Sequence, residues 1–367
     1  MGTFNIVIPI LSFGKAGGVR VLSKLANSFE EKGNKVVVVT YYKSPEPYYP
    51  INCEIQYVNE RGEIVDRRDC NGGKNVLKDF YVKIIRFLAL CNALNRLASA
   101  FDIVIANSNL TAFIVYKTKI KNKFYYIQAY EAWNEGKMGG FRNFLAKKSY
   151  RLNLTKIVNA ELYKNYKEIK SNYVVPPGLD LDLYYPKSEN NYWDNSRRMI
   201  IGHIGRMEEW KGSRETAEAI GILQKEGVRL DYRVAFNAPK EGLCSYELVK
   251  PDGDNNLSEY YRSVDVLVAP ARIQIGAVHY PVLEAMACGT PVITTGYYPA
   301  TNNNAWLVSV NSPEKIAEVI KKIMSDYSSA KRKAKIAIEE IKKFSWELVS
   351  DKMLSIISDN YDINGNA

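Results

Sequence analysis

Long apolar runs, paired cysteines and histidines are all scarce in this sequence, and each scarcity argues against a class of protein. No apolar run approaches the roughly 18 residues of a membrane-spanning helix, and the first ten residues lack the basic start of a signal peptide. The five cysteines are scattered and never spaced CxxC, which argues against a disulfide framework and a zinc site. We therefore expect a cytoplasmic protein with reduced cysteines, of which Cys91 and Cys288 lie in the core.

Acidic residues are scarce in the first half of the chain. Residues 1–187 hold 28 lysines and arginines against 16 aspartates and glutamates, a formal charge of +12, whereas the remainder holds 22 against 24. A uniformly basic chain would suggest nucleic acid, but this asymmetry favours one domain that faces an anionic membrane surface or an acidic acceptor. For any single lysine, a solvated surface position is the simpler interpretation. The helix expected at 76–100 is apolar around most of its circumference, which predicts a core position with a basic edge at Lys83, Arg86 and Arg96.

Strand and helix patterns alternate along the chain, whose apolar fraction of 46% is typical of a globular protein. Residues 171–196 interrupt the alternation with a stretch rich in proline, tyrosine and asparagine. This arrangement predicts an α/β protein with two doubly wound, Rossmann-like domains that face a central cleft. The expected strands are 4–10, 35–40, 53–58, 101–107, 123–128, 156–160, 199–206, 230–236, 265–270 and 291–295. The expected helices are 19–32, 76–100, 143–151, 213–226, 257–264 and 283–288, with lysine-rich helices after them.

A glycine-rich turn follows the first expected strand. Gly14, Gly17 and Gly18 allow a ligand to approach the backbone closely, and Val19 begins a helix whose free N–H groups attract anions. The segment is neither GxGxxG nor a P-loop, because no GKS or GKT ends it. A plain tight turn explains it equally well.

The segment GRMEEWKGS at 205–213 carries two cations between a strand and a helix. Arg206 stands at the strand end, and Lys211 precedes a helix opened by Gly212 and Ser213. A forked guanidinium and an ammonium beside free helix amides would bind a diphosphate. A surface arginine and lysine flanking a loop remain the alternative.

The segment GAVHYPVLEAMACGTPVITT at 276–295 places a carboxylate in a short helix. We expect Glu284 in the first turn of that helix, which ends at Gly289. An acid there complements the helix dipole, or it accepts hydrogen bonds from both hydroxyls of a ribose. The second interpretation gains weight because the segment follows GRMEEWKG within two βα units.

The motifs together resemble the retaining nucleotide-sugar glycosyltransferases of the GT-B fold, glycosyltransferase family 4. The likeness extends over nearly the whole chain, through GKAGG, VVPPGLDLDLYYP, GRMEEWKG, LSEYYRSVDVLVAP, PVLEAMACGTPVIT, NNNAWLV and FSW. The resemblance implies domains at 1–180 and 181–345, with a helix in 346–367 crossing back to the first domain. It also implies a nucleotide sugar as co-substrate, with no cofactor and no bound metal.

The resemblance assigns roles to individual positions. Arg206 and Lys211 correspond to the diphosphate clamp, and Glu284 corresponds to the ribose-binding carboxylate. Gly17 and Gly18 correspond to the loop near the donor phosphate. The backbone before Glu284, at Gly276, Ala277, His279 and Tyr280, is implied to face the donor.

Two departures from the family pattern affect the expected donor contact. Gly276 stands where the family usually has a glutamate, and Gln128, with Glu131 nearby, stands where a histidine is often found. We expect Gln128 and Glu131 at the catalytic site, although Glu131 is equally explained as a rim acid or as an acceptor-side base. These segments are similar to those of bacterial dTDP-rhamnose-dependent rhamnosyltransferases.

Other polar residues receive structural interpretations. His203 lies in a buried strand pattern, which favours a core position, whereas His279 precedes the helix of Glu284, which favours the site. The DLD at 180–182 and DGD at 252–254 lie in turn-rich segments, which favours turn formation and capping over metal binding.

The leading hypothesis is a hexosyltransferase that moves a sugar from a nucleotide-sugar donor to a saccharide or lipid-linked saccharide acceptor. We expect it in bacterial surface polysaccharide synthesis, at the inner face of the plasma membrane, without a nucleic-acid partner. An alternative is a catalytically inactive sugar-nucleotide-binding partner subunit, which Gly276 and the missing histidine suggest. A third is a non-hydrolysing epimerase or a phosphorylase on the same architecture.

Overall fold

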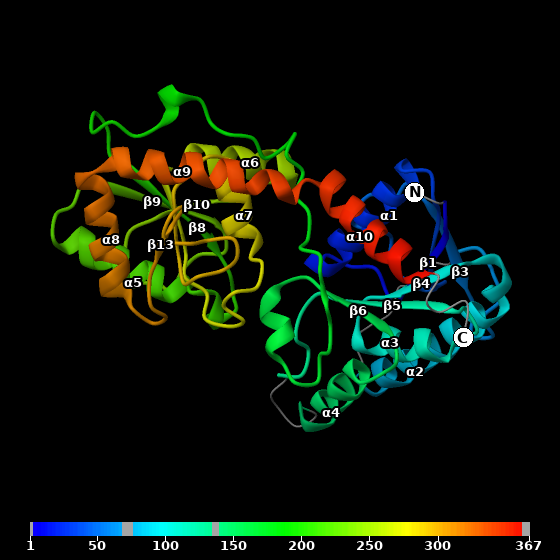
Figure 1. Cartoon of the computed structure of the whole chain (residues 1–367). Coiled ribbons are helices and arrows are strands. Elements are labelled where there is room, and N and C mark those ends of the chain that lie inside the picture. The colour runs from blue at the N-terminus through cyan, green and yellow to red at the C-terminus, as the bar shows by residue number, and fades with distance from the viewer. Residues whose placement is uncertain (1–2, 68–75, 134–138, 362–367) are drawn as a thin grey trace. The chain divides into compact units, whose positions relative to one another are not determined.

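The computed structural model describes residues 3–67, 76–133 and 139–361, except the side chains of residues 76–80 (Figure 1). Internal contacts divide the chain into two compact units. Unit 1 comprises Met1–Gly178 together with Trp346–Ala367, and unit 2 comprises Leu179–Ser345. Cys70 lies outside the described residues.

Unit 1 is built on a seven-stranded sheet in the order β3-β2-β1-β4-β5-β6-β7. Every pair of neighbouring strands in it is parallel. Its strands read as apolar runs because helices cover both faces, and Val36, Val37, Val38 and Val39 are all fully buried. The strands are β1 Asn5–Ile10, β2 Lys35–Tyr41, β3 Glu54–Val58, β4 Ile103–Ala106, β5 Asn122–Ile127, β6 Thr155–Val158 and β7 Tyr173–Val174.

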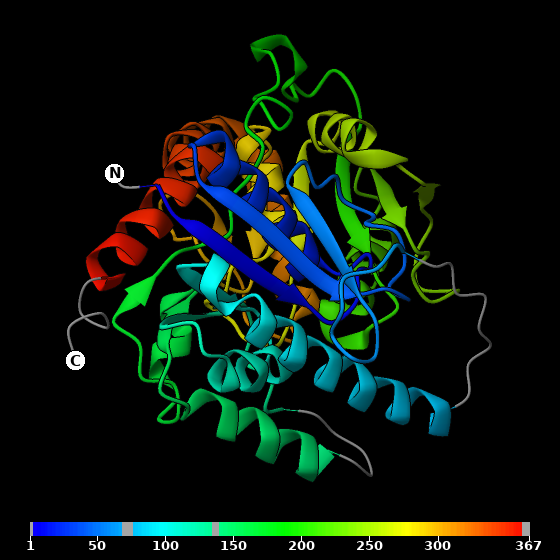
Figure 2. The same cartoon turned by 90° about the vertical axis from the view of Figure 1, so that its right-hand side faces the viewer.

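The helices of unit 1 lie in two layers. Figures 1 and 2 show α1 and α10 on one face of the sheet and α2, α3 and α4 on the other. Helix α10 packs on α1, and Ser28 Oγ is 2.8 Å from Ser350 Oγ. The helices are α1 Gly17–Glu31, α2 Val76–Arg96, α3 Asn109–Lys117, α4 Gly139–Tyr150 and α10 Trp346–Tyr361, with 3₁₀ turns η1 Ala98–Ala100 and η2 Glu161–Asn165.

Unit 2 repeats the same topology with six parallel strands in the order β10-β9-β8-β11-β12-β13. Its strands are β8 Met199–Gly205, β9 Leu230–Phe236, β10 Glu247–Val249, β11 Val266–Ala269, β12 Val292–Thr294 and β13 Trp306–Leu307. Its helices are α5 Ser213–Lys225, α6 Gly253–Ser263, α7 Tyr280–Ala287, α8 Pro313–Ser325 and α9 Tyr327–Ile341, with 3₁₀ turns η3 Glu189–Asn191, η4 Glu209–Lys211 and η5 Lys342–Phe344. The doubly wound sheets predicted from the sequence are confirmed in both units.

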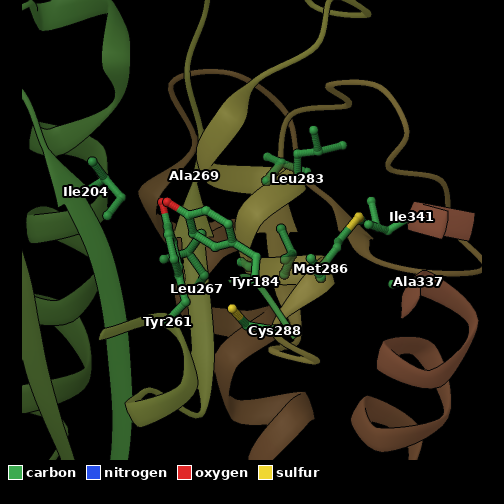
Figure 3. Close-up of a cluster of buried hydrophobic side chains, with 14 of the residues drawn as sticks. Tyr184, Ile204, Tyr261, Leu267, Ala269, Leu283, Met286, Cys288, Ala337 and Ile341 are labelled. Carbon is green, nitrogen blue, oxygen red and sulfur yellow. The ribbon is translucent and has the colours of Figure 1, made fainter. Parts of the chain in front are cut away.

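Two apolar clusters cover the two faces of the unit 2 sheet. One joins α5 and α8 to the strands and includes Ile220 and Ile320. The other packs α6, α7 and α9 together, and Figure 3 shows Met286 of α7 beside Ile341 of α9. Residues Val282 to Ala287 of α7 are all buried, so this helix is enclosed on every side.

The structure corrects several expectations. Helix α3 was not predicted, although Ser108 caps it and accepts a hydrogen bond from the Thr111 N–H at 3.4 Å. Cys91 is only half-buried, whereas Cys288 is fully buried as predicted. Helix α2 ends at Arg96, and it is not a core helix on all sides, because one stripe of its apolar residues faces solvent.

One buried carboxylate joins the start of β11 to β8 and to the segment just before β8. Asp265 is 1% exposed, and its two oxygens accept hydrogen bonds from the Arg197 guanidinium at 2.6 and 2.7 Å. It also accepts from the Ile200 N–H at 2.8 Å. The neighbouring pair Arg198–Asp231 has the same 2.6 Å separation, but both of its side chains are exposed.

We therefore predict that Asp265→Asn lowers the free energy of unfolding of unit 2 by about 2–3 kcal/mol, since it weakens charge-assisted bonds to a buried group. The matched variant Asp231→Asn should cost less than about 1 kcal/mol, because solvent screens the exposed pair. Urea unfolding followed by circular dichroism measures both values. Equal losses in the two variants would contradict the assignment of the buried pair as the structural one.

Candidate functional site

The strand order of unit 2 reverses between β8 and β11, which are adjacent although two helices and two strands separate them in the chain. Loops that leave such neighbouring strands at their carboxyl ends run in opposite directions and open a crevice between them. The loop after β8 carries Arg206 and Lys211, and the segment after β11 leads to Gly276 and His279. The topology therefore brings two of the predicted segments to one place.

The loop after β8 presents its two cations through a short 3₁₀ turn. Lys211 ends η4, and Gly212 follows with φ +83° as the N-cap of α5. A Cβ at position 212 would lie 2.7 Å from the Pro270 carbonyl oxygen, so this turn requires glycine. The helix start predicted at Ser213 is confirmed, and its first N–H groups point toward the loop by the geometry of any helix.

The two cations lie close enough to repel one another. The Lys211 Nζ is 4.1 Å from the Trp210 ring centroid, and the Arg206 guanidinium is 5.8 Å from the Phe236 ring centroid. Burial, and then the nearby Arg206 charge, lower the pKa of Lys211 to about 8, although Glu208 partly opposes this. Glu208 therefore offsets only part of the effect of burial and of Arg206 on the Lys211 charge.

His279 adds an uncharged imidazole beside these two cations. Its ring packs against Tyr297 with the centroids 4.8 Å apart, and its enclosed Nδ1 has no hydrogen-bond partner among the described residues. Burial lowers the pKa of His279 well below its usual value, and the charges of Lys211 and Arg206 lower it further. The imidazole is therefore neutral at physiological pH and has an unused polar atom within this basic cluster.

Glu284 differs from its predicted setting. Helix α7 begins at Tyr280, so Glu284 lies in the second turn, and the explanation by the helix dipole does not apply. Its side chain is 3% exposed and accepts a hydrogen bond from the Tyr261 hydroxyl at 2.8 Å. The helix does end as predicted, with Gly289 at φ +68°. The carboxylate is held in a fixed orientation by Tyr261, which the sequence had not singled out.

A chain of hydrogen bonds links the core of the sheet to the Arg206 loop. His203 Nδ1 is 2.7 Å from the Val268 carbonyl oxygen, which can only accept, so Nδ1 carries the proton. Nε2 then accepts from the Ser213 hydroxyl at 3.0 Å, and Ser213 Oγ in turn accepts from the Arg206 N–H at 3.1 Å. His203 is buried, as predicted, but it also positions the loop through Ser213.

Arg272 braces the same turn from the segment after β11. Its N–H donates to the Trp210 carbonyl at 2.9 Å, and its guanidinium donates to the Glu209 carbonyl at 2.8 Å. A 3.4 Å ion pair with Glu215 connects it to α5. Sequence reasoning missed Arg272 because its partners are backbone carbonyls, which no motif encodes.

The remaining predicted residues of unit 2 lie in the segment between β11 and the start of α7. Gly276 has φ +95°, a conformation that side chains rarely adopt. Ala277 is buried; its N–H donates to the Gln274 carbonyl, and its carbonyl accepts from the Tyr298 N–H. Tyr280 is half-buried and opens α7. Arg206, Lys211, His279 and their supporting residues thus gather in unit 2.

The predicted residues of unit 1 form a separate group. Gln128 follows β5, and its Nε2 donates to the Gly18 carbonyl at 3.3 Å. A Cβ on Gly18 would lie 3.3 Å from Gln128 Oε1, whereas one on Gly17 would meet open space. Helix α1 begins at Gly17, two residues before the predicted start, with no side-chain cap.

Glu131 lies near the first turn of α3. Its carboxylate accepts from the Asn109 N–H at 3.0 Å and from the Tyr125 hydroxyl at 3.5 Å. Burial raises the pKa of Glu131 to about 7, although both hydrogen bonds oppose the rise. A carboxyl group that titrates near neutrality can exchange a proton during turnover, and this one also anchors a helix.

Two features are absent from the part of the chain that the structure describes. No group of three or more histidine, cysteine, aspartate or glutamate side chains there could hold a metal ion. None of the helices there is long and apolar enough to cross a membrane. Asp252 is the N-cap residue of α6, but its side chain makes no capping hydrogen bond, so the predicted capping role is wrong for it.

The buried His203 predicts a pH-dependent stability. Burial lowers the pKa of His203 to about 4, compared with about 6.5 in an unfolded chain. As pH falls from 6.5 to 4, the unfolded state takes up the proton first, so unit 2 should lose up to about 3 kcal/mol of stability. His203→Asn should flatten this slope in urea unfolding across that range. An unchanged slope would assign the pH dependence to other groups.

Residues 198–326 match the family described as glycosyl transferases group 1. D-inositol 3-phosphate glycosyltransferase of Corynebacterium jeikeium (strain K411) is 25% identical over 211 residues, which are 49% of this chain and 50% of that protein. The chain spans about half the length of the curated relatives it matches.

Solved structures share the architecture of the whole chain. Anabaena Alr3699/HepE in complex with UDP-glucose has a TM-score of 0.70 at 12% identity, covering 97% of this chain and 100% of that one. WaaG, a glycosyltransferase involved in lipopolysaccharide biosynthesis, has a TM-score of 0.66 at 17% identity, covering 99% and 100%. The chain thus has the GT-B fold, and the segment that contains the basic cluster is similar to the glycosyl transferases group 1.

Proposed function

We propose that this protein is a retaining glycosyltransferase that moves a sugar from a nucleotide-sugar donor to a saccharide or lipid-linked saccharide acceptor. The observation that carries the proposal is the basic cluster of Arg206, Lys211 and His279 at the topological switch point of unit 2. Its segment is also the one that matches the glycosyl transferases group 1.

A diphosphate suits this cluster on electrostatic grounds. Burial first, and then the neighbouring Arg206 charge, disfavour the charged form of Lys211 in the free protein and lower its pKa. An anion between the two cations offsets their repulsion, and the N-terminus of α5 adds partial positive charge. The same groups stabilise the nucleoside diphosphate as it leaves, which lowers the barrier without a metal ion in the proposed reaction.

The neighbouring residues have separate roles in the proposal. Glu284, oriented by Tyr261, accepts hydrogen bonds from the donor ribose. His279 uses its unpaired Nδ1, with the backbone of Ala277 and Tyr280, to contact the donor. In unit 1, Gly17, Gly18 and Gln128 contact ligand, and Glu131 acts as a general base on the acceptor hydroxyl, which its pKa of about 7 permits.

The proposed donor is a deoxysugar nucleotide such as dTDP-rhamnose. Gly276 stands where the family resemblance leads us to expect a glutamate, and its φ of +95° would strain a glutamate side chain. A sugar with fewer hydroxyl groups needs fewer polar contacts, which accords with the loss of that carboxylate. We place the reaction in surface polysaccharide synthesis at the inner membrane face.

The central prediction concerns Lys211 and Glu284. Lys211→Ala should lower the transfer rate by roughly 100-fold or more, because one preorganised charge on the leaving group is lost. Glu284→Gln, which keeps the side-chain shape, should weaken donor binding by roughly tenfold or more. Transfer of radiolabelled sugar to saccharide and to inositol phosphate acceptors measures the rate. Thermal stabilisation by a panel of UDP-, GDP- and dTDP-sugars measures donor binding.

Lys225→Ala is the matched control, because Lys225 is an exposed lysine in the last turn of the same helix that Lys211 precedes. It should retain full activity. Wild-type turnover in both the Lys211 and Glu284 variants would defeat the proposal. Donor binding without any transfer or hydrolysis would instead identify an inactive sugar-nucleotide-binding subunit.

The pKa of Lys211 predicts a pH profile. The free protein loses the Lys211 charge as pH rises through about 8, while a bound diphosphate favours the charged form. Affinity for the nucleoside diphosphate should therefore fall as pH rises above about 8. Calorimetric titration from pH 6 to 9 measures this, and Lys211→Arg, which stays charged, should flatten the curve. An equally steep fall in Lys211→Arg would remove Lys211 from the phosphate site.

A further inference from the structure

We infer that α2, α3 and α4 of unit 1 form a docking face for an anionic lipid bilayer. This face, called the helical face below, consists of the exposed side chains of residues 81–96, 109–117 and 139–150. This inference rests on the proposed function, in which the acceptor is linked to a lipid. It adds the surface of this chain that contacts the lipid bilayer.

Large apolar side chains gather on the helical face instead of in the core. Six of them are between 42% and 65% exposed: Tyr81, Ile84, Leu88, Tyr116, Phe141 and Phe144. On α2 they follow the spacing i, i+3, i+7, so they form one stripe on one side of the helix. Single exposed apolar residues need no explanation, but a cluster on adjacent helices marks an interaction surface.

The charges on the helical face all have one sign. Its three segments contain no aspartate or glutamate, whereas six of their lysines and arginines are exposed: Lys83, Arg96, Lys117, Arg142, Lys147 and Lys148. The Lys148 Nζ lies 5.4 Å from the Phe144 ring centroid, and the Lys117 Nζ lies 5.7 Å from that of Phe87. Long cationic side chains beside exposed aromatic rings suit the boundary between acyl chains and anionic head groups.

The three helices form one continuous layer. Helix α3 packs on both α2 and α4, and Figures 1 and 2 show all three on the same side of the unit 1 sheet. The residues of this layer that contact the sheet are buried, so its exposed stripes face away from the sheet. Adjacent helices that expose both apolar side chains and cations are suited to contact a broad anionic surface. They are less suited to contact a single peptide in a narrow groove.

Charge also argues against a second copy of this chain as the partner. A symmetric dimer would place the helical face against itself, and the six exposed cations on each side would then repel, since the face itself has no acid and Glu168 beside it forms an ion pair, at 4.0 Å, with Lys147. A bilayer containing anionic lipids supplies both the apolar interior and the negative charge. Each lysine or arginine near such a surface strengthens binding roughly fivefold, and salt weakens it.

Vesicle sedimentation of the full-length protein tests this inference. The protein should sediment with vesicles of phosphatidylglycerol and phosphatidylcholine in equal parts, and much less with phosphatidylcholine alone. Two double variants should each bind vesicles roughly tenfold or more weakly: Phe141→Ser with Phe144→Ser, and Lys147→Glu with Lys148→Glu. Added salt should weaken vesicle binding by the wild-type protein. Equal binding to both vesicle types, or unchanged binding of both double variants, would overturn the inference.

Matched controls separate the helical face from general surface effects. Ile336→Ser on α9 removes another exposed apolar side chain, and Lys321→Glu with Lys322→Glu on α8 reverses another adjacent exposed pair. Both controls should sediment like the wild type, and all variants should keep the wild-type thermal midpoint. Loss of binding in the controls equal to that in the helical-face variants would refute a specific surface.

Two further measurements keep the outcomes distinct. Light scattering without lipid should show no self-association through Phe141 and Phe144, and a dimer abolished by their replacement would establish a second copy as the partner instead. Sedimentation is measured without nucleotide sugar. Vesicle binding with no transferase activity would support the helical face while defeating the proposed reaction, and activity without vesicle binding would do the opposite.

Discussion

Repulsion between two cations is the constraint from which the unit 2 site follows. Arg206 and Lys211 lie on one loop, and burial of Lys211, followed by the charge of the exposed Arg206, disfavours the charged form of Lys211. A folded chain tolerates this only if the surrounding structure fixes both groups in place. The Gly212 turn, the brace from Arg272 and the bond to Ser213 supply that support from three directions. In the proposed reaction, a diphosphate bound between the two cations offsets this cost.

The sheet topology explains why these supports are available. Because β8 and β11 are neighbours, His203 of β8 can reach the Val268 carbonyl of β11 and still contact Ser213 at the start of α5. A neutral imidazole suits this role, since it donates on one side and accepts on the other. The same adjacency lets the segment after β11 reach the η4 turn through Arg272. Core and site are therefore parts of one hydrogen-bonded structure.

The sequence predicted the doubly wound sheets, the long apolar strands and the α5 start because these depend on local periodicity and glycine placement. It missed α3, whose nine residues mix apolar and polar positions without a clear amphipathic period. It also misplaced Glu284 by one turn, since a proline such as Pro281 can sit at either of the first helical positions. Tyr261 and Arg272 could not be found from sequence, because their roles depend on partners that are distant in the chain or belong to the backbone.

The excess positive charge in the first half of the chain has different structural roles in different elements of unit 1. Some cations of unit 1 make hydrogen bonds within the unit. The Lys156 ammonium, for example, donates to the carbonyls of Leu152 and Leu154. The cations of the helical face have exposed heads, and residues 81–96, 109–117 and 139–150 contain no aspartate or glutamate. A chain that needed positive charge only for solubility would have no reason to combine it with exposed Phe141 and Phe144, which oppose solubility. The combination is explained if the charge attracts a surface that then receives the aromatic rings.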